Sequence, residues 1–182
     1  MIQEKIQFNK LQDVLKSFLS LHTEIEINLK FKEIGDLGTQ SLSSALINCT
    51  NLQKLTLDLR VNKIKDAGVQ KLASAFIQCA NLSSLFLYLS SNQIGSNGVL
   101  GLCSVLAGCK SISNLELDLY SNQICANGAT SLCSVLLNKT NMINVILNIN
   151  SNKIQSKGAS NLCSGLAECT KLSNLKTLKP IF

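Results

Sequence analysis

The chain has 182 residues, of which 17 are Lys or Arg and 11 are Asp or Glu, so its formal net charge is +6 with the single histidine neutral. This length fits one domain with a substantial core. The sequence carries no phosphate-loop, zinc-protease or serine-hydrolase motif, and it has only His22 as an imidazole, so we expect no catalytic, cofactor or metal site.

Residues 1–21 begin the chain with apolar side chains at helical spacing. They include Ile6, Val14 and Phe18. We expect a helix over 1–21 that caps the core, because a terminal unit must cover the open end of a repeat array. A disordered leader is the alternative. Charged residues interrupt the apolar run, which argues against a secretory signal, and no stretch predicts a membrane span.

A thirty-residue repeat fills residues 22–182. Its clearest copy, residues 52–64, reads LQKLTLDLRVNKI and returns at 82–94, 112–124 and 142–154. The common pattern is L-x-x-L-x-L-x-L-x-x-N-x-I, with Ile, Met or Val replacing Leu at some positions. Self-similarity at a period of this size is typical of stacked-repeat proteins. We count about five full repeats and a partial sixth.

Each repeat predicts a strand, a bend, a helix and a return. The alternation of Leu55, Leu57 and Leu59 predicts a strand with these side chains on one face. An asparagine follows at the bend, where its amide can hydrogen-bond buried backbone groups. These structural positions are Asn62, Asn92, Asn122 and Asn152, whereas the first repeat has Lys32. Apolar pairs four residues apart then predict a helix, for which we expect Asp36, Asp66, Ser96 and Ser156 as N-caps.

This pattern resembles the leucine-rich repeat, in the long, helix-containing subtype of ribonuclease inhibitor and the Ran GTPase-activating protein. The resemblance covers about residues 25–178. It implies an α/β fold, a curved right-handed β–α solenoid with parallel strands on the concave side and helices on the convex side. Each repeat carries about two residues more in its strand segment than is usual, so we expect longer strands.

Eight cysteines follow the repeat. Cys49, Cys79, Cys109 and Cys169 share one column, Cys103, Cys133 and Cys163 share another, and only Cys125 lies outside both. A column is filled by one packing requirement, and a free cysteine packs as a small apolar side chain. With no C-x-x-C pair, zinc binding is not favoured. We expect eight reduced, buried thiols and therefore a cytoplasmic protein.

The strand residues that point away from the core form three columns. The first is Glu26, Thr56, Phe86, Glu116 and Ile146, the second Asn28, Asp58, Tyr88, Asp118 and Asn148, and the third Lys30, Arg60, Ser90, Tyr120 and Asn150. Interfaces favour aromatic anchors and arginine. The candidate partner-binding residues are Asp58, Arg60, Phe86, Tyr88, Glu116, Asp118, Tyr120 and Asn148, although Phe86 and Tyr88 could be ordinary surface aromatics.

These observations predict a non-catalytic module that binds a partner protein through the concave strand face. The lysines are spread over the loops, so no specific nucleic acid is expected, and no membrane. One alternative is an enzyme regulator, either a GTPase-activating protein or an inhibitor. Another is the repeat region of a longer signalling protein, such as a kinase. The last repeat loses its pattern at Thr177 and Pro180, which suggests end-to-end association through an uncapped end.

Overall fold

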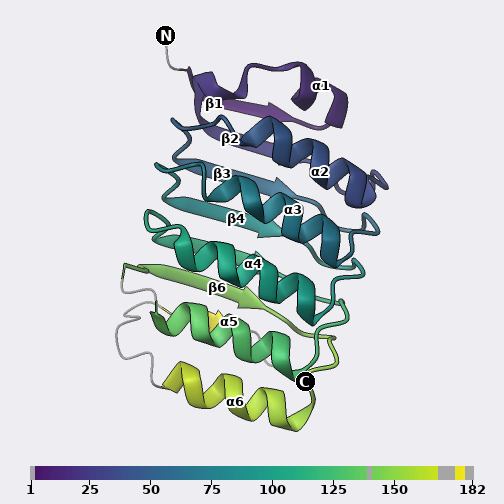
Figure 1. Cartoon of the computed structure of the whole chain (residues 1–182), viewed down its shortest axis with the longest axis vertical. Coiled ribbons are helices and arrows are strands. Elements are labelled where there is room, and N and C mark those ends of the chain that lie inside the picture. The colour runs from purple at the N-terminus through teal and green to yellow at the C-terminus, as the bar shows by residue number, and fades with distance from the viewer. Residues whose placement is uncertain (1–2, 139–140, 168–174, 179–182) are drawn as a thin grey trace.

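The computed structural model describes residues 3–138, 141–167 and 175–178, in which strands and helices alternate along the chain (Figure 1). The strands are β1 Gln3–Phe8, β2 His22–Asn28, β3 Lys54–Asp58, β4 Ser84–Tyr88, β5 Asn114–Asp118, β6 Asn144–Asn148 and β7 Leu175–Leu178. The helices are α1 Leu11–Lys16, α2 Gly35–Leu46, α3 Asp66–Phe76, α4 Ser96–Gly108, α5 Ala126–Asn138 and α6 Gln155–Ala167, with a 3-10 turn at Leu19–Leu21.

All seven strands form one open parallel sheet in chain order, and the helices stack against one of its faces (Figure 1). The predicted α/β solenoid is therefore confirmed. The core fills the space between the two layers. In the second repeat, Leu55, Leu57 and Leu59 of the strand segment and Leu72 of α3 are fully buried. No helix in the described part of the chain is long and apolar enough to cross a membrane.

The single helix expected over residues 1–21 is wrong. Gln3–Phe8 is a strand that pairs in parallel with β2, from Gln3 opposite His22 to Phe8 opposite Ile27. Only the six residues of α1 are α-helical in this segment. The free edge of β2 offers hydrogen-bond partners to an extended chain, and this pairing outweighs the local helical spacing. The segment is thus a shortened strand–helix unit at the end of the stack.

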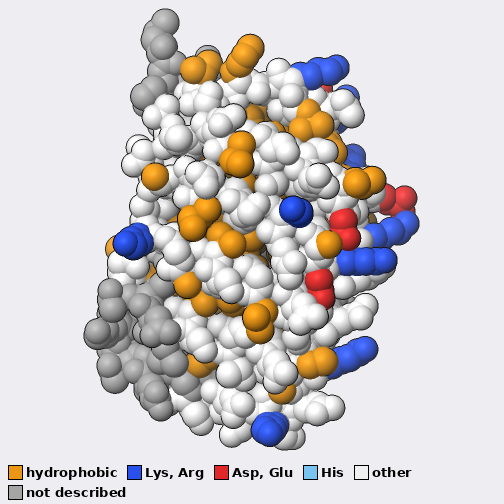
Figure 2. All heavy atoms as spheres, in the orientation of Figure 1, with side chains coloured by type: hydrophobic (Ala, Val, Ile, Leu, Met, Phe, Trp, Pro, Cys, Tyr) orange, Lys and Arg blue, Asp and Glu red, His pale blue; other side chains and the backbone are white. Residues whose placement is uncertain are grey.

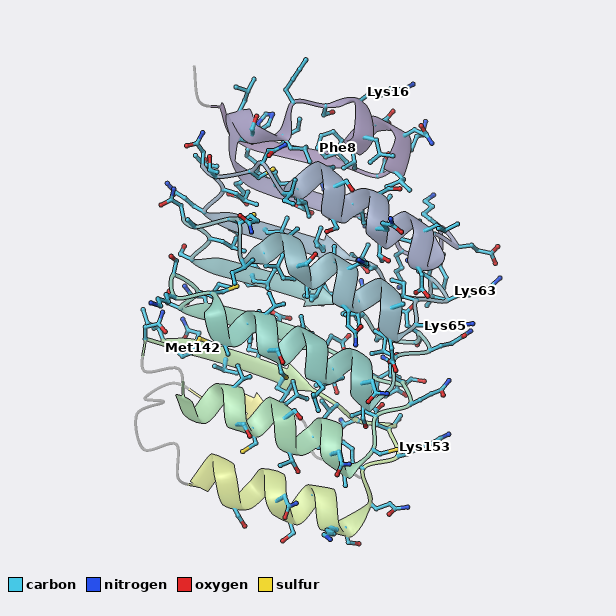
Figure 3. The ribbon with its side chains drawn as sticks, viewed as in Figure 1. Phe8, Lys16, Lys63, Lys65, Met142 and Lys153 are labelled. Atoms are coloured by element: carbon cyan, nitrogen blue, oxygen red, sulfur yellow. The ribbon has the colours of Figure 1, made fainter. Side chains whose placement is uncertain are left out.

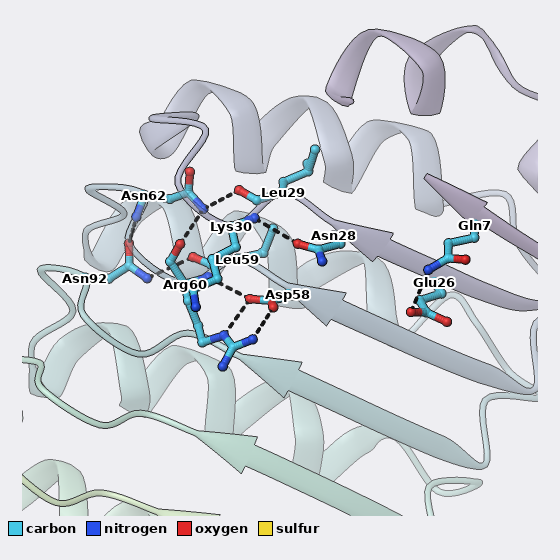
Figure 4. A network of polar contacts seen from close by, with 10 residues as sticks. All are labelled: Gln7, Glu26, Asn28, Leu29, Lys30, Asp58, Leu59, Arg60, Asn62 and Asn92. Carbon is cyan, nitrogen blue, oxygen red and sulfur yellow. Dashed lines mark hydrogen bonds and ion pairs between the residues drawn. The ribbon is translucent and has the colours of Figure 1, made fainter. Parts of the chain in front are cut away.

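The bend asparagines hydrogen-bond the backbone of the preceding repeat. Asn92 accepts through Oδ1 from the amides of Asn62 at 3.0 Å and Ile64 at 2.9 Å. Its Nδ2 donates to the carbonyls of Leu59 at 3.1 Å and Leu89 at 2.9 Å. Figure 4 shows the contacts of Asn62 and Asn92 together. Each of these side chains therefore satisfies buried groups in its own repeat and in its neighbour.

The strand hydrogen bonding continues beyond the last strand residue. The Leu59 amide donates to the Tyr88 carbonyl at 2.9 Å, and the Val61 amide donates to the Ser90 carbonyl at 3.0 Å. The two extra residues of each repeat thus lengthen this ladder. The residue before each bend asparagine has a positive φ, for example 57° at Val61 and 53° at Ser121. This conformation is strained for the β-branched Val61.

Three of the expected N-cap residues, Asp36, Asp66 and Ser96, bond the next repeat instead of their own helix. Asp66 is the first residue of α3, and its Oδ1 accepts from the amide of Gly95 at 2.6 Å. Ser96 likewise accepts from the amide of Cys125 at 2.9 Å. A Cβ at Gly98 would lie 2.6 Å from Asp66 Oδ1, which is too close for any side chain there. The glycine column therefore makes room for the preceding repeat.

The prediction of buried cysteines is confirmed for the described cysteines in the two repeat columns and is wrong for Cys125. The buried cysteines in the described part of the chain are Cys49, Cys79, Cys103, Cys109 and Cys133. Cys125 is exposed, because it precedes α5 in a loop rather than facing the core. Burial raises the pKa of Cys49 to about 11 and that of Cys103 to about 12. The expectations for the Cys163 side chain and for Cys169 lie outside the described residues.

The asparagine network predicts a specific cost for Asn122→Ala. The Ile94 amide and the carbonyls of Leu89 and Leu119 would each lose a hydrogen-bond partner. We expect the free energy of unfolding to fall by about 1–3 kcal/mol in chemical denaturation. Asn127→Ala, an exposed position in α5, is the control and should be nearly neutral. Equal stability of the two variants would show that water satisfies the bend.

Thiol labelling tests the cysteine assignment. Because the thiolate is the reactive form, the five buried thiols should stay unlabelled until the protein unfolds, whereas Cys125 should react in the native protein. Peptide mapping by mass spectrometry identifies each labelled cysteine, and Cys125→Ser removes the fast reaction. Rapid native labelling of Cys79 or Cys103 would contradict the buried assignment.

Candidate protein-binding surface

The strand face is the surface of the sheet opposite the helices, formed by the outward side chains of the strands. Register places each outward column side by side across the sheet. Tyr88 lies opposite Asp58 on one side and Asp118 on the other. Phe86 lies between Thr56 and Glu116 in the same way. Since paired strands lie about 4.8 Å apart, these columns form one continuous surface.

Arg60, Asp58 and Tyr88 form a compact group on this face. The guanidinium of Arg60 donates through Nε to Asp58 Oδ1 at 2.8 Å and also pairs with Oδ2 (Figure 4). Its Cζ lies 5.5 Å from the centre of the Tyr88 ring. The carboxylate raises the pKa of Arg60. Burial, with help from the carboxylate of Glu116, raises the pKa of Tyr88 to about 12.

Several candidate residues also hold the ends of their own strands. Asp118 Oδ1 accepts from the Tyr120 amide at 3.1 Å and from Asn148 Nδ2 at 2.9 Å. Asp58 receives the amide of Arg60 at 3.3 Å. Asx contacts of this kind fix the chain where it leaves the strand. Asp118, Asn148 and Asp58 are therefore structural residues as well as candidates for binding.

Exposure separates the outward columns further. Tyr120 is 43% exposed, while Phe86, Tyr88 and Glu116 are half-buried. Asp58 and Ser90 lie in the outward columns but are each only 7% exposed, so a partner would reach little of either side chain. Asp58 is covered by the arginine that it binds.

The sequence reading missed a fourth outward column. It consists of Glu24, Lys54, Ser84, Asn114 and Asn144 at the strand starts. Lys54 Nζ lies 2.8 Å from Glu24 and 5.8 Å from the centre of the Phe86 ring. Lys5 of β1 also pairs with Glu24, at 3.7 Å. The period-two alternation, continued one step toward the amino terminus, would have revealed this column.

The rest of the described chain offers little chemistry. His22 is only 4% exposed, and the equivalent positions of the following repeats are apolar: Leu52, Leu82, Ile112 and Met142. No group of three His, Cys, Asp or Glu side chains that could hold a metal occurs among the described residues. On the helix face, apolar side chains (orange in Figure 2) are scattered among uncharged polar side chains and backbone atoms (white). Lys63, Lys65 and Lys153 project from the loops at one margin (Figure 3).

The Tyr88 environment predicts an alkaline titration. The chain has two tyrosines, so Tyr120→Phe leaves Tyr88 as the only phenol. Its tyrosinate absorbance should rise with a midpoint near 12 rather than 10 while circular dichroism stays native. The raised pKa means that folding stability from this group is intact below pH 10 and is lost as pH rises toward 12. A midpoint near 10 in folded protein would contradict the buried environment.

Comparison with known proteins supports the repeat assignment. The "Leucine Rich repeat" family model matches residues 48–73, 85–103 and 145–163. The actin-binding site 2 of leiomodin-1 superposes with a TM-score of 0.61 at 16% identity, over 87% of this chain and 86% of that one. An internalin from Listeria monocytogenes gives a TM-score of 0.42 at 17% identity, over 94% of this chain and 52% of that one.

No curated protein sequence matches this chain. The ribonuclease-inhibitor-like subtype suggested by the repeat length is not established by these comparisons. The matched repeats, the parallel sheet and the leiomodin superposition agree on one fold. The chain therefore contains leucine-rich repeats, matched over residues 48–73, 85–103 and 145–163, and it has the strand–helix fold that its repeat pattern predicts.

Proposed function

We propose that this protein is a non-catalytic module that binds a partner protein through its strand face. The observation that carries the proposal is the placement of Phe86, Tyr88 and Tyr120 on that face. These rings point away from the core that the alternate leucines fill. Aromatic side chains in this position lie outside the core, and aromatic side chains are enriched in protein interfaces.

Rigidity supports the same proposal. The strand face is one sheet surface whose strands are cross-linked by the asparagine network and by the extended backbone ladder. A surface that is ordered before binding loses little conformational entropy on association. Leucine-rich repeat proteins in general act as interaction modules, which agrees with this reading.

An enzyme regulator is the alternative that shares this surface. A GTPase activator must aim a polar side chain at the bound nucleotide, and Arg60 is held by Asp58 instead. Measuring stimulated hydrolysis by small GTPases separates regulation from plain binding. The leiomodin segment is described as an actin-binding site, so actin is a reasonable first partner to test. We also propose a cytoplasmic location, because cysteines that pack in the core as thiols suit a reducing compartment.

The double substitution Tyr88→Ala with Tyr120→Ala tests the proposal. Loss of central aromatic anchors typically weakens an interface by about 2 kcal/mol or more, or roughly thirtyfold. Folding should survive, with a loss of about 1 kcal/mol, because Tyr120 is exposed and Tyr88 is half-buried. We expect affinity capture from lysate, read by mass spectrometry, to lose the proteins that the wild type retains.

The matched control removes apolar area from the helix face. Leu37 and Leu100 are 80% and 48% exposed, so Leu37→Ala with Leu100→Ala should leave capture unchanged. If the tyrosine variant captures the same proteins as wild type, or if only the helix-face variant loses them, the partner binds elsewhere and the proposal fails.

A further inference from the structure

Charge is divided unevenly along the strand face. Over β1–β3, the outward basic residues are Lys5, Lys30, Lys54 and Arg60, and the acidic ones are Glu24, Glu26 and Asp58. Each acidic group there has a basic partner: Glu24 pairs with Lys5 and Lys54, Glu26 with Lys5, and Asp58 with Arg60. Every carboxylate in this half of the face therefore has a basic partner, and one basic residue, Lys30, is in excess.

The other half carries carboxylates but no basic residue of its own, although Arg60 of the preceding half also acts electrostatically on Asp118. Over residues 84–90, 114–120 and 144–150, the only charged side chains are Glu116 and Asp118. No ion pair of the described residues involves either of them. Asp118 accepts hydrogen bonds from the Tyr120 amide and from Asn148 Nδ2, which are neutral donors. A negative region thus lies on a protein whose net charge is +6.

Aromatic rings border these carboxylates. Tyr88 lies directly opposite Asp118 in the β4–β5 register, and Phe86 lies opposite Glu116. Tyr120 follows Asp118 by two residues and is 43% exposed. A guanidinium can stack on an aromatic ring while its N–H groups bond a carboxylate. Aromatic rings beside carboxylates that form no ion pair are therefore complementary to arginine.

The same face already contains one such arrangement. Arg60 bonds the Asp58 carboxylate and lies 5.5 Å from the centre of the Tyr88 ring. Two repeats later, Asp118 occupies the column of Asp58, but Tyr120 stands in the column of Arg60. The carboxylate recurs there without the arginine of its own chain. An arginine from a partner would supply the missing cation.

We infer that the strand face over β4–β6 binds an arginine side chain of a partner segment, between Tyr120 and Tyr88 and against the carboxylates of Glu116 and Asp118. This inference rests on the proposed function and specifies its partner: an exposed segment rich in arginine. The guanidinium donates to the carboxylates and stacks on the tyrosine rings. The guanidinium then gives Glu116 and Asp118 a basic partner, which each carboxylate of the β1–β3 half already has.

The decisive variant is Glu116→Gln with Asp118→Asn. Both changes remove a negative charge and keep the side-chain shape. An amide oxygen at position 118 can still accept from the Tyr120 amide and Asn148 Nδ2, so the strand end should remain intact. The matched control is Asp13→Asn with Glu33→Gln. Both control residues are exposed and lie off the strand face, and the change in net charge is the same.

The probe is a short fluorescent peptide of alternating arginine and glycine, compared with one in which neutral citrulline replaces arginine. In fluorescence anisotropy at low ionic strength, the arginine peptide should bind wild type, and citrulline should abolish binding. We expect about tenfold weaker binding to the Glu116/Asp118 variant and no more than about a twofold change in the control. Circular dichroism confirms that each variant is folded.

Equal binding of the two peptides, no binding of either, or an unchanged affinity in the Glu116/Asp118 variant would overturn the inference. The proposed function is judged separately, by lysate capture with the tyrosine double variant. Should that variant lose its partner while the Glu116/Asp118 variant retains it, the strand face still binds protein, but not through arginine. The two failures are therefore distinguishable.

Discussion

The structure depends on satisfying the backbone at the bend where each strand leaves the sheet. An amide or carbonyl buried without a partner is costly, and every repeat brings several such groups to the same place. One asparagine side chain solves this, because it donates and accepts at once. Asn122 bonds the Leu89 carbonyl and the Ile94 amide of the repeat before it. The repeat is thus stable only against a neighbour, which favours a continuous stack.

Two further contacts follow the same direction along the stack. Asp66 at the start of α3 receives the amide of Gly95, and Gly98 lacks a side chain where Asp66 must fit. The inward leucines of each strand pack in the core between the sheet and the helices. These contacts hold the repeats together without the outward side chains of the strand face, whose structural role is mainly to fix the strand ends. Tyr120, which is 43% exposed, and the carboxylates of Glu116 and Asp118 are therefore the groups that we expect a partner to contact.

The periodic part of this fold could be predicted from sequence because every repeat meets the same packing requirement. Strands, helices and the leucine columns follow from spacing alone. Features that occur at only one position could not be predicted in this way. Gln3–Phe8 pairs with β2 because that edge of the sheet is free, and the local spacing of apolar residues does not encode this pairing. Asp66 matches an N-cap by residue type, yet its partner lies in the next repeat. On the strand face, spacing places Tyr88 and Tyr120, but only the structure shows that Arg60 is already bound to Asp58.

Hydroxyl-radical footprinting of the protein in complex with a captured partner tests recognition through the strand face most directly. Side chains are oxidised where they meet solvent, so a partner on this face should shield Tyr120 and Phe86. Leu37 and Leu100, exposed on the helix side, should be oxidised equally in the free and bound protein. Shielding of Leu37 and Leu100 with unchanged oxidation of Tyr120 would contradict the account.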